Sequence, residues 1–177
     1  MRQPQRHAGQ GRRAHVPAAS GGLIDVRALT DPDAERIGDG LPLARLGGPQ
    51  TYFVAWDDSE PVAHGCVAWT RTTLGVPEVQ DVFVREDRRR RGIGEELMRG
   101  IERVVGERGH ERVSISYGIE NTAARKLYEK LGYRDAGVPP QRVVGTILVR
   151  SGPLEVDDTL IYLVKDIPVD LEASRSS

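Results

Sequence analysis

The chain has 177 residues, 38% of them hydrophobic, and a formal net charge of -1 at pH 7. This length suits one domain with a packed core, and no stretch approaches the ~18 consecutive apolar residues of a membrane span. The charge balance disfavours a general role in nucleic-acid binding, since such proteins commonly carry a positive field. One cysteine and four scattered histidines predict neither an internal disulfide nor a metal site.

The N-terminal segment differs in composition from the rest of the chain. Residues 1–22 contain four arginines, no acidic residue and many small or turn-forming residues, so we expect a disordered basic tail. A nucleic-acid arm or a targeting peptide is the alternative reading of this tail. No repeat or linker divides the remainder, which predicts one domain over residues 23–170 and a flexible end over residues 171–177. The N-terminus lacks an apolar signal sequence, and we expect a cytoplasmic protein.

The first half of the predicted domain is rich in strands. The segment LIDVRAL (23–29) predicts a strand, and TDPDAERI (30–37) predicts a helix capped by Asp31 with Pro32 in its first turn. Two β-rich runs within 51–72 surround a polar turn, the pattern of an antiparallel hairpin. The segment PEVQDVFV, which ends at residue 84, predicts a third consecutive strand.

The second half alternates helices and strands. Apolar residues at helical spacing predict a helix over 92–107, closed by Gly109, and its apolar face should pack on the sheet. The segment ERVSISYGI (111–119) predicts a strand, and NTAARKLYEKLGY (121–133) predicts a helix between Asn121 and Gly132. Two further strands are expected over 142–149 and 159–164. This order predicts a mixed α/β sheet rather than a regular βαβ repeat.

The segment VQDVFVREDRRRRGIGEELM (79–98) passes from a strand through four arginines and Gly-Ile-Gly into a helix. A dinucleotide fingerprint would need a glycine in place of Leu97, and no Gly-Lys-Ser/Thr makes a P-loop. At Gly92 and Gly94 the bare backbone can approach a ligand at the helix N-terminus, where amides favour an anion. Arginines add charge-assisted donors to phosphate. The pattern favours an anion-binding turn; the alternative is a solvated charged loop.

These residues carry a resemblance to a known family. The hexapeptide from Arg89 to Gly94 resembles the Q/R-x-x-G-x-G/A signature of the GCN5-related N-acetyltransferases, the GNAT superfamily. The preceding strand, the helix that starts at the signature, and ENTAARKLYEKLGY (120–133) also resemble the family's motifs. The likeness covers about 23–167 in element order and 78–134 at motif level. It implies the GNAT acyl-CoA N-acyltransferase fold, with a mixed, mostly antiparallel central sheet flanked by helices.

The resemblance implies acetyl-CoA as the acyl donor. Family members splay the strand that corresponds to 78–84 away from its neighbour, so that its backbone can pair with the pantetheine arm. The diphosphate would lie on the amides of residues 89–94, and a backbone N–H near Val82 could stabilise the oxyanion. The expected cofactor-binding residues are Val82, Phe83, Val84, Arg89, Arg90, Arg91, Gly92, Ile93, Gly94, Asn121 and Tyr128.

Three residues are candidates for proton transfer. Tyr128 resembles the family's tyrosine that protonates the departing thiolate, and a phenol pKa of ~10 suits that task; its alternative is an ordinary core tyrosine. An alkylammonium acceptor, with a pKa of ~10.4 in the lysine-like case, must lose a proton before attack. Glu78 lies where some histone-acetylating relatives place a base, and Asp81 where some polyamine-acetylating relatives carry an acid. We favour Glu78; a base acting through water, or a neutral acceptor, would require neither.

The predicted function is that of an acetyl-CoA-dependent N-acetyltransferase that transfers the acetyl group directly in a ternary complex. The acceptor would be a small-molecule amine or a protein amino group, and the sequence does not indicate which. The alternative is a CoA-binding regulatory or interaction module without efficient transfer. No nucleophile is needed, so Cys66 is expected to be a buried strand residue.

The sequence also bears on nucleic acid, membrane and a second copy of the chain as partners. Glu86 and Asp87 interrupt the basic run, which disfavours nucleic acid, and no membrane partner is expected. The resemblance is compatible with a homodimer. The segment 137–158 is longer than a minimal connection, and we expect it to line the acceptor site or to contact a second copy.

Overall fold

The computed structural model describes residues 23–30, 33–34, 37, 41, 50–149 and 152–168. The two predicted tails and the helix cap expected at Asp31 and Pro32 lie outside these residues. Among the described residues, no helix is long and apolar enough to cross a membrane.

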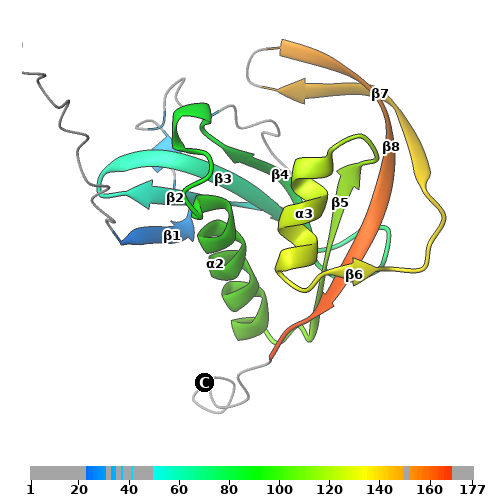
Figure 1. Cartoon of the computed structure of the whole chain (residues 1–177), viewed down its shortest axis with the longest axis horizontal. Coiled ribbons are helices and arrows are strands. Elements are labelled where there is room, and N and C mark those ends of the chain that lie inside the picture. Colours follow the sequence, from blue (N-terminus) through cyan, green and yellow to red (C-terminus); the bar gives the residue numbers. More distant parts are fainter. Residues whose placement is uncertain are drawn as a thin grey trace, which may run out of the picture.

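One eight-stranded sheet forms the body of the described structure (Figure 1). Its order is β1-β2-β3-β4-β5-β8-β6, with β7 paired to β8. The strands are β1 (Ile24–Ala28), β2 (Gln50–Asp57), β3 (Glu60–Ala68), β4 (Glu78–Val84), β5 (Arg112–Gly118), β6 (Arg134–Asp135), β7 (Gln141–Val149) and β8 (Gly152–Asp166). All pairs are antiparallel except β4 with β5. The predicted mixed, mostly antiparallel sheet is therefore confirmed.

Two α-helices cover one face of this sheet in the view of Figure 1. A 3₁₀ turn, η2 (Glu86–Arg88), precedes α2 (Ile93–Glu107), and α3 (Thr122–Lys130) follows β5. Helix α2 buries Ile93, Leu97, Met98, Ile101 and Val105 in the core between helix and sheet, as its apolar periodicity predicts.

The predicted ends of both helices are confirmed. The Asn121 side chain accepts a hydrogen bond of 3.0 Å from the backbone N–H of Ala124, so it caps α3. Gly109 and Gly132 follow the two helices with φ of 82° and 89°, a conformation that glycine adopts at little cost.

The strands at the C-terminal end differ from prediction in length. Strand β8 begins at Gly152 rather than at residue 159, and the two-residue β6 was not predicted. Residues 152–159 of β8 pair with β7 and with no other strand, so the two form a ribbon, here called the arm, that curls away from the sheet (Figure 1). The strand predicted over 142–149 corresponds to β7, so the unpredicted part of the arm is the start of β8, residues 152–158.

Strand β4 leaves its neighbour β5 early. The two strands pair at Glu78↔Ser114 and Val79↔Ile115 and nowhere else. On the other side, the register with β3 shifts after Gln80, and Asp81 has a positive φ of 52°. A β-bulge of this kind redirects the strand and its side chains. The predicted splay of this strand is therefore present, and residues 80–84 have no partner in β5.

Cys66 and His64 lie in β3, and both side chains are fully buried. The Cys66 Sγ lies 3.7 Å from Gln50 Oε1, and His64 stacks on Phe83 with ring centres 5.4 Å apart. The prediction that Cys66 is a buried strand residue is confirmed.

Close packing of α2 on β1 gives a test of the fold. A Cβ on Gly100 would lie 2.6 Å from Cβ of Val26, so Gly100→Ala should lower the free energy of unfolding by about 1–2 kcal/mol through overpacking. In an open helix the same change would stabilise by up to about 1 kcal/mol. Urea denaturation measures the difference, with Arg103→Ala on the exposed face of α2 as the control. A Gly100→Ala variant more stable than the parent would contradict this packing.

Candidate active site

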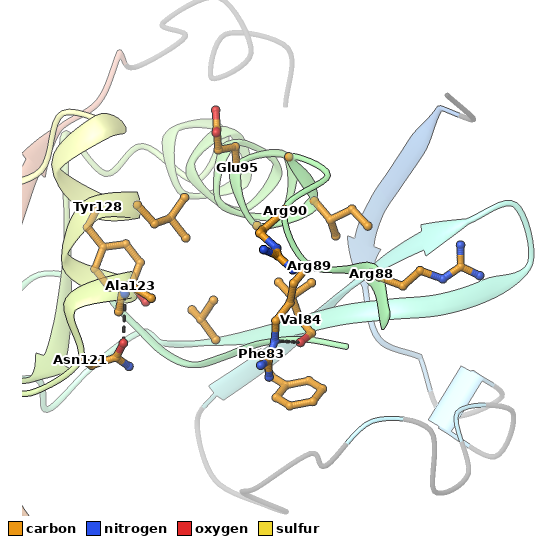
Figure 2. Close-up of a pocket in the computed structure, with 15 residues that line it drawn as sticks. Phe83, Val84, Arg88, Arg89, Arg90, Glu95, Asn121, Ala123 and Tyr128 are labelled. Carbon is orange, nitrogen blue, oxygen red and sulfur yellow. Dashed lines mark hydrogen bonds between the residues drawn. The ribbon is translucent and has the colours of Figure 1, made fainter. Parts of the chain in front are cut away.

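A cleft of about 570 Å³ opens between the end of β4, the turn before α2 and the helix α3. Figure 2 shows Tyr128 and Asn121 on the α3 side of this cleft and Val84 and Arg89 across from them. The lining residues are Val82, Phe83, Val84, Arg88, Arg89, Arg90, Gly92, Ile93, Gly94, Glu95, Asn121, Ala123, Ala124, Leu127 and Tyr128. Every residue predicted to bind the cofactor lies here except Arg91, whose side chain is exposed and does not line the cleft.

The two glycines of the turn serve different structural needs. Gly92 caps α2 with a φ of 80°, and a Cβ there would meet nothing within 4 Å, so the space beside it is open. A Cβ on Gly94 would instead lie 3.3 Å from Leu127 Cδ2 and 3.6 Å from Val84 Cγ2. Gly94 therefore lets α2, α3 and β4 approach one another, whereas the sequence suggested only ligand approach for both positions.

The first turn of α2 faces this cleft with polar backbone groups. The N–H groups of Glu95 and Glu96 donate to the carbonyl of Gly92 at 3.0 and 3.1 Å, and this closes the first helical turn. The amides of Ile93 and Gly94 precede any intrahelical acceptor, as do the first amides of every α-helix. Together with the positive end of the helix dipole, they form a setting that favours an anion.

The four arginines of the run divide into two groups. Arg88 binds Asp57 at 3.1 Å and also Glu60, both at the β2–β3 turn. Arg85 binds the same Glu60 at 2.5 Å, and this hydrogen bond lowers the pKa of the Glu60 carboxyl. Arg88 therefore links the turn to the β2–β3 hairpin, and the alternative of a solvated charged loop does not hold for this residue.

Arg89 and Arg90 are the arginines of the run that remain for the cleft. Arg89 Nε donates to the carbonyl of Val84 at 3.1 Å, and its guanidinium lies 5.9 Å from the ring centre of Phe83. The Val84 carbonyl is thus engaged, although the sequence suggested it was open to a ligand. Arg90 has a positive φ of 62° and makes no ion pair with any residue that the structure describes.

Tyr128 lies both in the core and on the cleft wall. Its side chain is 5% exposed, and its ring centre lies 6.0 Å from that of Tyr133 and 6.3 Å from that of Tyr117. Burial raises the pKa of Tyr128 to about 12. The phenol therefore keeps its proton over the whole physiological pH range.

A second cavity, of about 400 Å³, lies between the start of β4, the end of β5 and the arm. Its lining residues are Arg71, Thr72, Thr73, Glu78, Gln80, Asp81, Ser116, Val143, Gly145, Thr146, Ile147, Val156, Asp158, Leu160 and Tyr162. Strand β4 lines both hollows, this cavity with residues 78, 80 and 81 and the cleft with residues 82–84. The side chains of β4 switch from the second cavity to the cleft at the bulge, between residues 81 and 82.

Glu78 is buried in the second cavity with a residue exposure of 4%. Its Oε1 accepts hydrogen bonds from Gln80 Nε2 at 3.1 Å and from Ser116 Oγ at 3.4 Å. No ion pair joins it to any described residue. A buried carboxylate without a cation is costly, so Glu78 is a candidate for a chemical role.

Asp81 has a different environment, although it lines the same cavity. The Tyr52 hydroxyl donates to Asp81 Oδ2 at 2.8 Å, and Nδ1 of the buried His64 lies 3.7 Å from the same oxygen. These contacts anchor the bulge to β2 and β3. Asp81 therefore has a structural role whether or not it takes part in chemistry.

A known protein family matches the region that contains the cleft, the splayed strand and the turn. The model of the Acetyltransferase (GNAT) family matches residues 26–133, more than half of the chain. The chain belongs to this family of acetyltransferases. The residues that resembled the GNAT signature and its second motif thus lie inside the matched region, and both motifs contribute residues to the walls of one cleft.

Curated relatives of this GNAT chain match it over part of their length. Mycothiol acetyltransferase of Clavibacter sepedonicus is 36% identical over 73 residues, 41% of this chain and 24% of that protein. An uncharacterized N-acetyltransferase of Methanocaldococcus jannaschii is 35% identical over 102 residues, 56% of this chain and 41% of that protein. The chain spans less than half the length of either relative.

Solved structures agree on the GNAT fold. The IAA acetyltransferase from Bacillus cereus aligns with a TM-score of 0.60 at 16% identity, covering 82% of this chain and all of that one. A GNAT family acetyltransferase from Elizabethkingia anophelis with acetyl-CoA bound aligns with a TM-score of 0.58 at 18% identity, covering 81% and 98%. At these identities the likeness establishes the fold class predicted from the sequence.

Several residues of the GNAT chain's second cavity were not predicted. Ser116 and Asp158 reach it from β5 and β8, and the arm supplies one wall. The sequence signals for the arm were the strand predicted over 142–149 and the unusual length of the segment 137–158. Among the described residues, no group of three or more His, Cys, Asp or Glu is placed to hold a metal ion.

Proposed function

We propose that this GNAT chain is an N-acetyltransferase that moves an acetyl group from acetyl-CoA directly to an amine in a ternary complex. The observation that carries the proposal is the position of β4 between two cavities. One cavity ends at the glycine and arginine turn before α2, which suits a phosphate, and the other is lined by carboxylates. The family match supports acetyl transfer, and a fold relative with acetyl-CoA bound supports the choice of donor.

The residues of the first cleft fit a donor with a diphosphate and an amide-rich arm. The space beside Gly92 is open, the first amides of α2 face an anion, and Arg89 and Arg90 add positive charge. Residues 80–84 have no partner in β5, so their backbone edge can pair with an extended ligand. When bound, acetyl-CoA supplies an acyl carbon activated by a thiolate leaving group.

Tyr128 is proposed to hold the proton that the leaving sulfur needs. With a pKa of about 12, the Tyr128 phenol is protonated when the reaction begins. A thiol with a pKa of ~8.5 is the stronger acid, so proton transfer from the phenol to a free thiolate is uphill in water. The phenol thus acts as a general acid only while negative charge develops on sulfur, and it regains a proton easily afterwards.

Glu78 is proposed to take the proton of the acceptor amine. Its carboxylate is held by Gln80 and Ser116, which donate to one oxygen and leave the other without a donor among the described residues. Asp81 is the second candidate base, and its contacts with Tyr52 and His64 favour the structural role. The acceptor is a small-molecule amine or a protein amino group.

Acetyl-CoA binding tests the proposal first. Isothermal titration should show binding to the wild type and none to Gly92→Glu, because a carboxylate beside the turn repels the diphosphate. Gly109→Glu is the matched control: it has the same charge and the same left-handed φ, at the other end of α2. If both variants bind like the wild type, the cleft is not the donor site.

Measurement of thiol release with a panel of amines then distinguishes an acetyltransferase from a CoA-binding module. Release on addition of amine is expected of the transferase, whereas tight binding with no release to any amine is expected of a CoA-binding module.

The role of Tyr128 gives a second prediction. Tyr128→Phe should lower kcat by about 100-fold, the usual lower range for a lost general acid, with acetyl-CoA affinity unchanged. Since the pKa is about 12, the ratio of wild-type to variant kcat should stay constant up to about pH 10.5. Tyr133→Phe, a buried tyrosine outside the cleft, is the control. If the ratio of wild-type to variant kcat falls by half near pH ~10, Tyr128 is an ordinary phenol. A ratio of one would contradict the role of Tyr128 as general acid.

The role of Glu78 as the base gives a third prediction. Glu78→Gln keeps the shape and removes the proton acceptor, so kcat should fall by about 100-fold near neutral pH. The loss should shrink as pH approaches the amine pKa of ~10.4, where the acceptor arrives neutral. Asp81→Asn, measured in parallel, should retain most of its activity. The reverse result would transfer the assignment to Asp81.

A further inference from the structure

The second cavity is strongly acidic for its size. Its lining includes the carboxylates of Glu78, Asp81 and Asp158 and a single guanidinium, that of Arg71, which gives a net charge of -2. Arg71 is exposed, whereas Glu78 is buried. The inner part of the cavity is therefore the more negative, and it attracts cations.

Two of the three carboxylates have no cation to balance them. Asp81 is engaged by Tyr52 and lies near His64, but neither Glu78 nor Asp158 forms an ion pair within the described residues. Glu78 Oε2 also accepts no hydrogen bond there, although the residue is only 4% exposed. A carboxylate removed from water to this degree is stabilised by a positively charged partner. Such a partner is expected to come from the ligand.

Asp158 is directed into the cavity by the strand that carries it. Its neighbour Asp157 binds Arg142 across the arm at 2.9 Å and does not line the cavity, as alternation along a strand requires. The backbone N–H of Thr159 donates to Asp158 Oδ1 at 2.7 Å. The other oxygen lies 2.2 Å from the position that a Cβ on Gly118 would occupy. The bare backbone of Gly118 thus makes room for this carboxylate at the end of β5.

Apolar side chains cover much of the rest of the wall. Val143, Ile147, Val156 and Leu160 line the cavity from the arm and the adjoining part of β8. Their surface suits a methylene chain, in the way that aliphatic stems lie on apolar surfaces while their charged ends reach polar groups. A volume of about 400 Å³ suits a small molecule.

We infer that the acceptor is a small aliphatic molecule with two ammonium groups, one that reacts beside Glu78 and one that pairs with Asp158. This inference rests on the proposed function and names its substrate class. In the transfer, a bond forms between the acceptor nitrogen and the acetyl carbon, and the bond from that carbon to sulfur breaks. The reacting ammonium first loses one proton to Glu78, which releases it to solvent, and the neutral amine then attacks the acetyl carbon. The nitrogen loses its second proton to Glu78 as the amide forms, and the sulfur leaves as the thiol with the proton of Tyr128. Solvent carries the second proton from Glu78 to Tyr128, so the net products are the amide, the thiol and one released proton. The second ammonium is unchanged.

Matched amines test the substrate class. Thiol release from acetyl-CoA is measured with butane-1,4-diamine, butylamine and 4-aminobutanoate, which differ in the far end of a four-carbon chain. Propane-1,3-diamine and hexane-1,6-diamine with their monoamines extend the set to other lengths. At its best length the diamine should exceed the monoamine in kcat/KM by about ten-fold or more, the value of one hydrogen bond to a charged group. The aminobutanoate should be the poorest, because its carboxylate meets Asp158.

Three results would overturn the inference. Equal use of monoamine and diamine at every length would show that no second charge is recognised. Preference for 4-aminobutanoate would indicate that Arg71 binds a carboxylate instead. Faster acetylation of a peptide N-terminus than of any diamine would indicate a protein acceptor.

The matched variants are Asp158→Asn and Asp157→Asn, which neutralise adjacent carboxylates that lie on opposite faces of the strand. Asp158→Asn should raise the KM for the diamine by about ten-fold and the KM for butylamine by a smaller factor. Asp157→Asn should change neither KM. An equal effect of the two variants, or an equal effect of Asp158→Asn on diamine and monoamine, would contradict the pairing.

A binding measurement keeps this inference separate from the transferase proposal. Calorimetric titration of the wild type with butane-1,4-diamine, without acetyl-CoA, should show binding that Asp158→Asn weakens. If acetyl-CoA fails to bind while the diamine binds, the proposed function fails and the cavity assignment stands. If transfer occurs and the diamine shows neither binding nor preference, the assignment of the cavity fails alone.

Discussion

The candidate active site depends on one interruption of hydrogen bonding in the sheet. After Val79, β4 no longer pairs with β5, and the bulge at Asp81 turns the strand so that its neighbouring residues line two different cavities. A continuous parallel pair would fill this gap with backbone hydrogen bonds and leave no open edge. The contacts of Asp81 with Tyr52 and His64 hold the bulge in place, which explains why a carboxylate with a positive φ is retained inside a strand.

In the charged turn after β4, some arginines hold the structure in place and others line the candidate site. Arg85 and Arg88 bind carboxylates of the β2–β3 turn and fix the path of the chain, while Arg89 and Arg90 remain at the cleft. A run of four exposed cations would repel itself and move freely in solvent. Because the acidic partners come from a distant part of the sequence, the turn is held rigidly enough to present Gly92 and the first amides of α2 in one arrangement.

Local sequence patterns predicted most of the fold and one of the two cavities. The periodicity of α2, the cap at Asn121 and the glycines after both helices are local features, and each lies where it was expected. One strand of the arm, β7, was predicted at 142–149, but the start of β8 was missed because an exposed strand buries little apolar surface and so has a weak sequence pattern. Ser116, Asp158 and the partners of Arg88 could not be predicted, since strand order and register bring together side chains that are 28 or more residues apart in the sequence.

The proposed proton donor, Tyr128, and the proposed proton acceptor, Glu78, lie in environments of opposite character. Tyr128 lies among aromatic rings, where burial raises its pKa to about 12 and keeps the proton on the phenol. Glu78 is buried among neutral donors, Gln80 and Ser116, that orient one oxygen without neutralising it. A fixed arginine or lysine beside Glu78 would hold the carboxylate in a permanent ion pair and compete with the amine. The described residues provide no such cation, which is costly for stability. The ammonium of the proposed acceptor would then become the partner of Glu78.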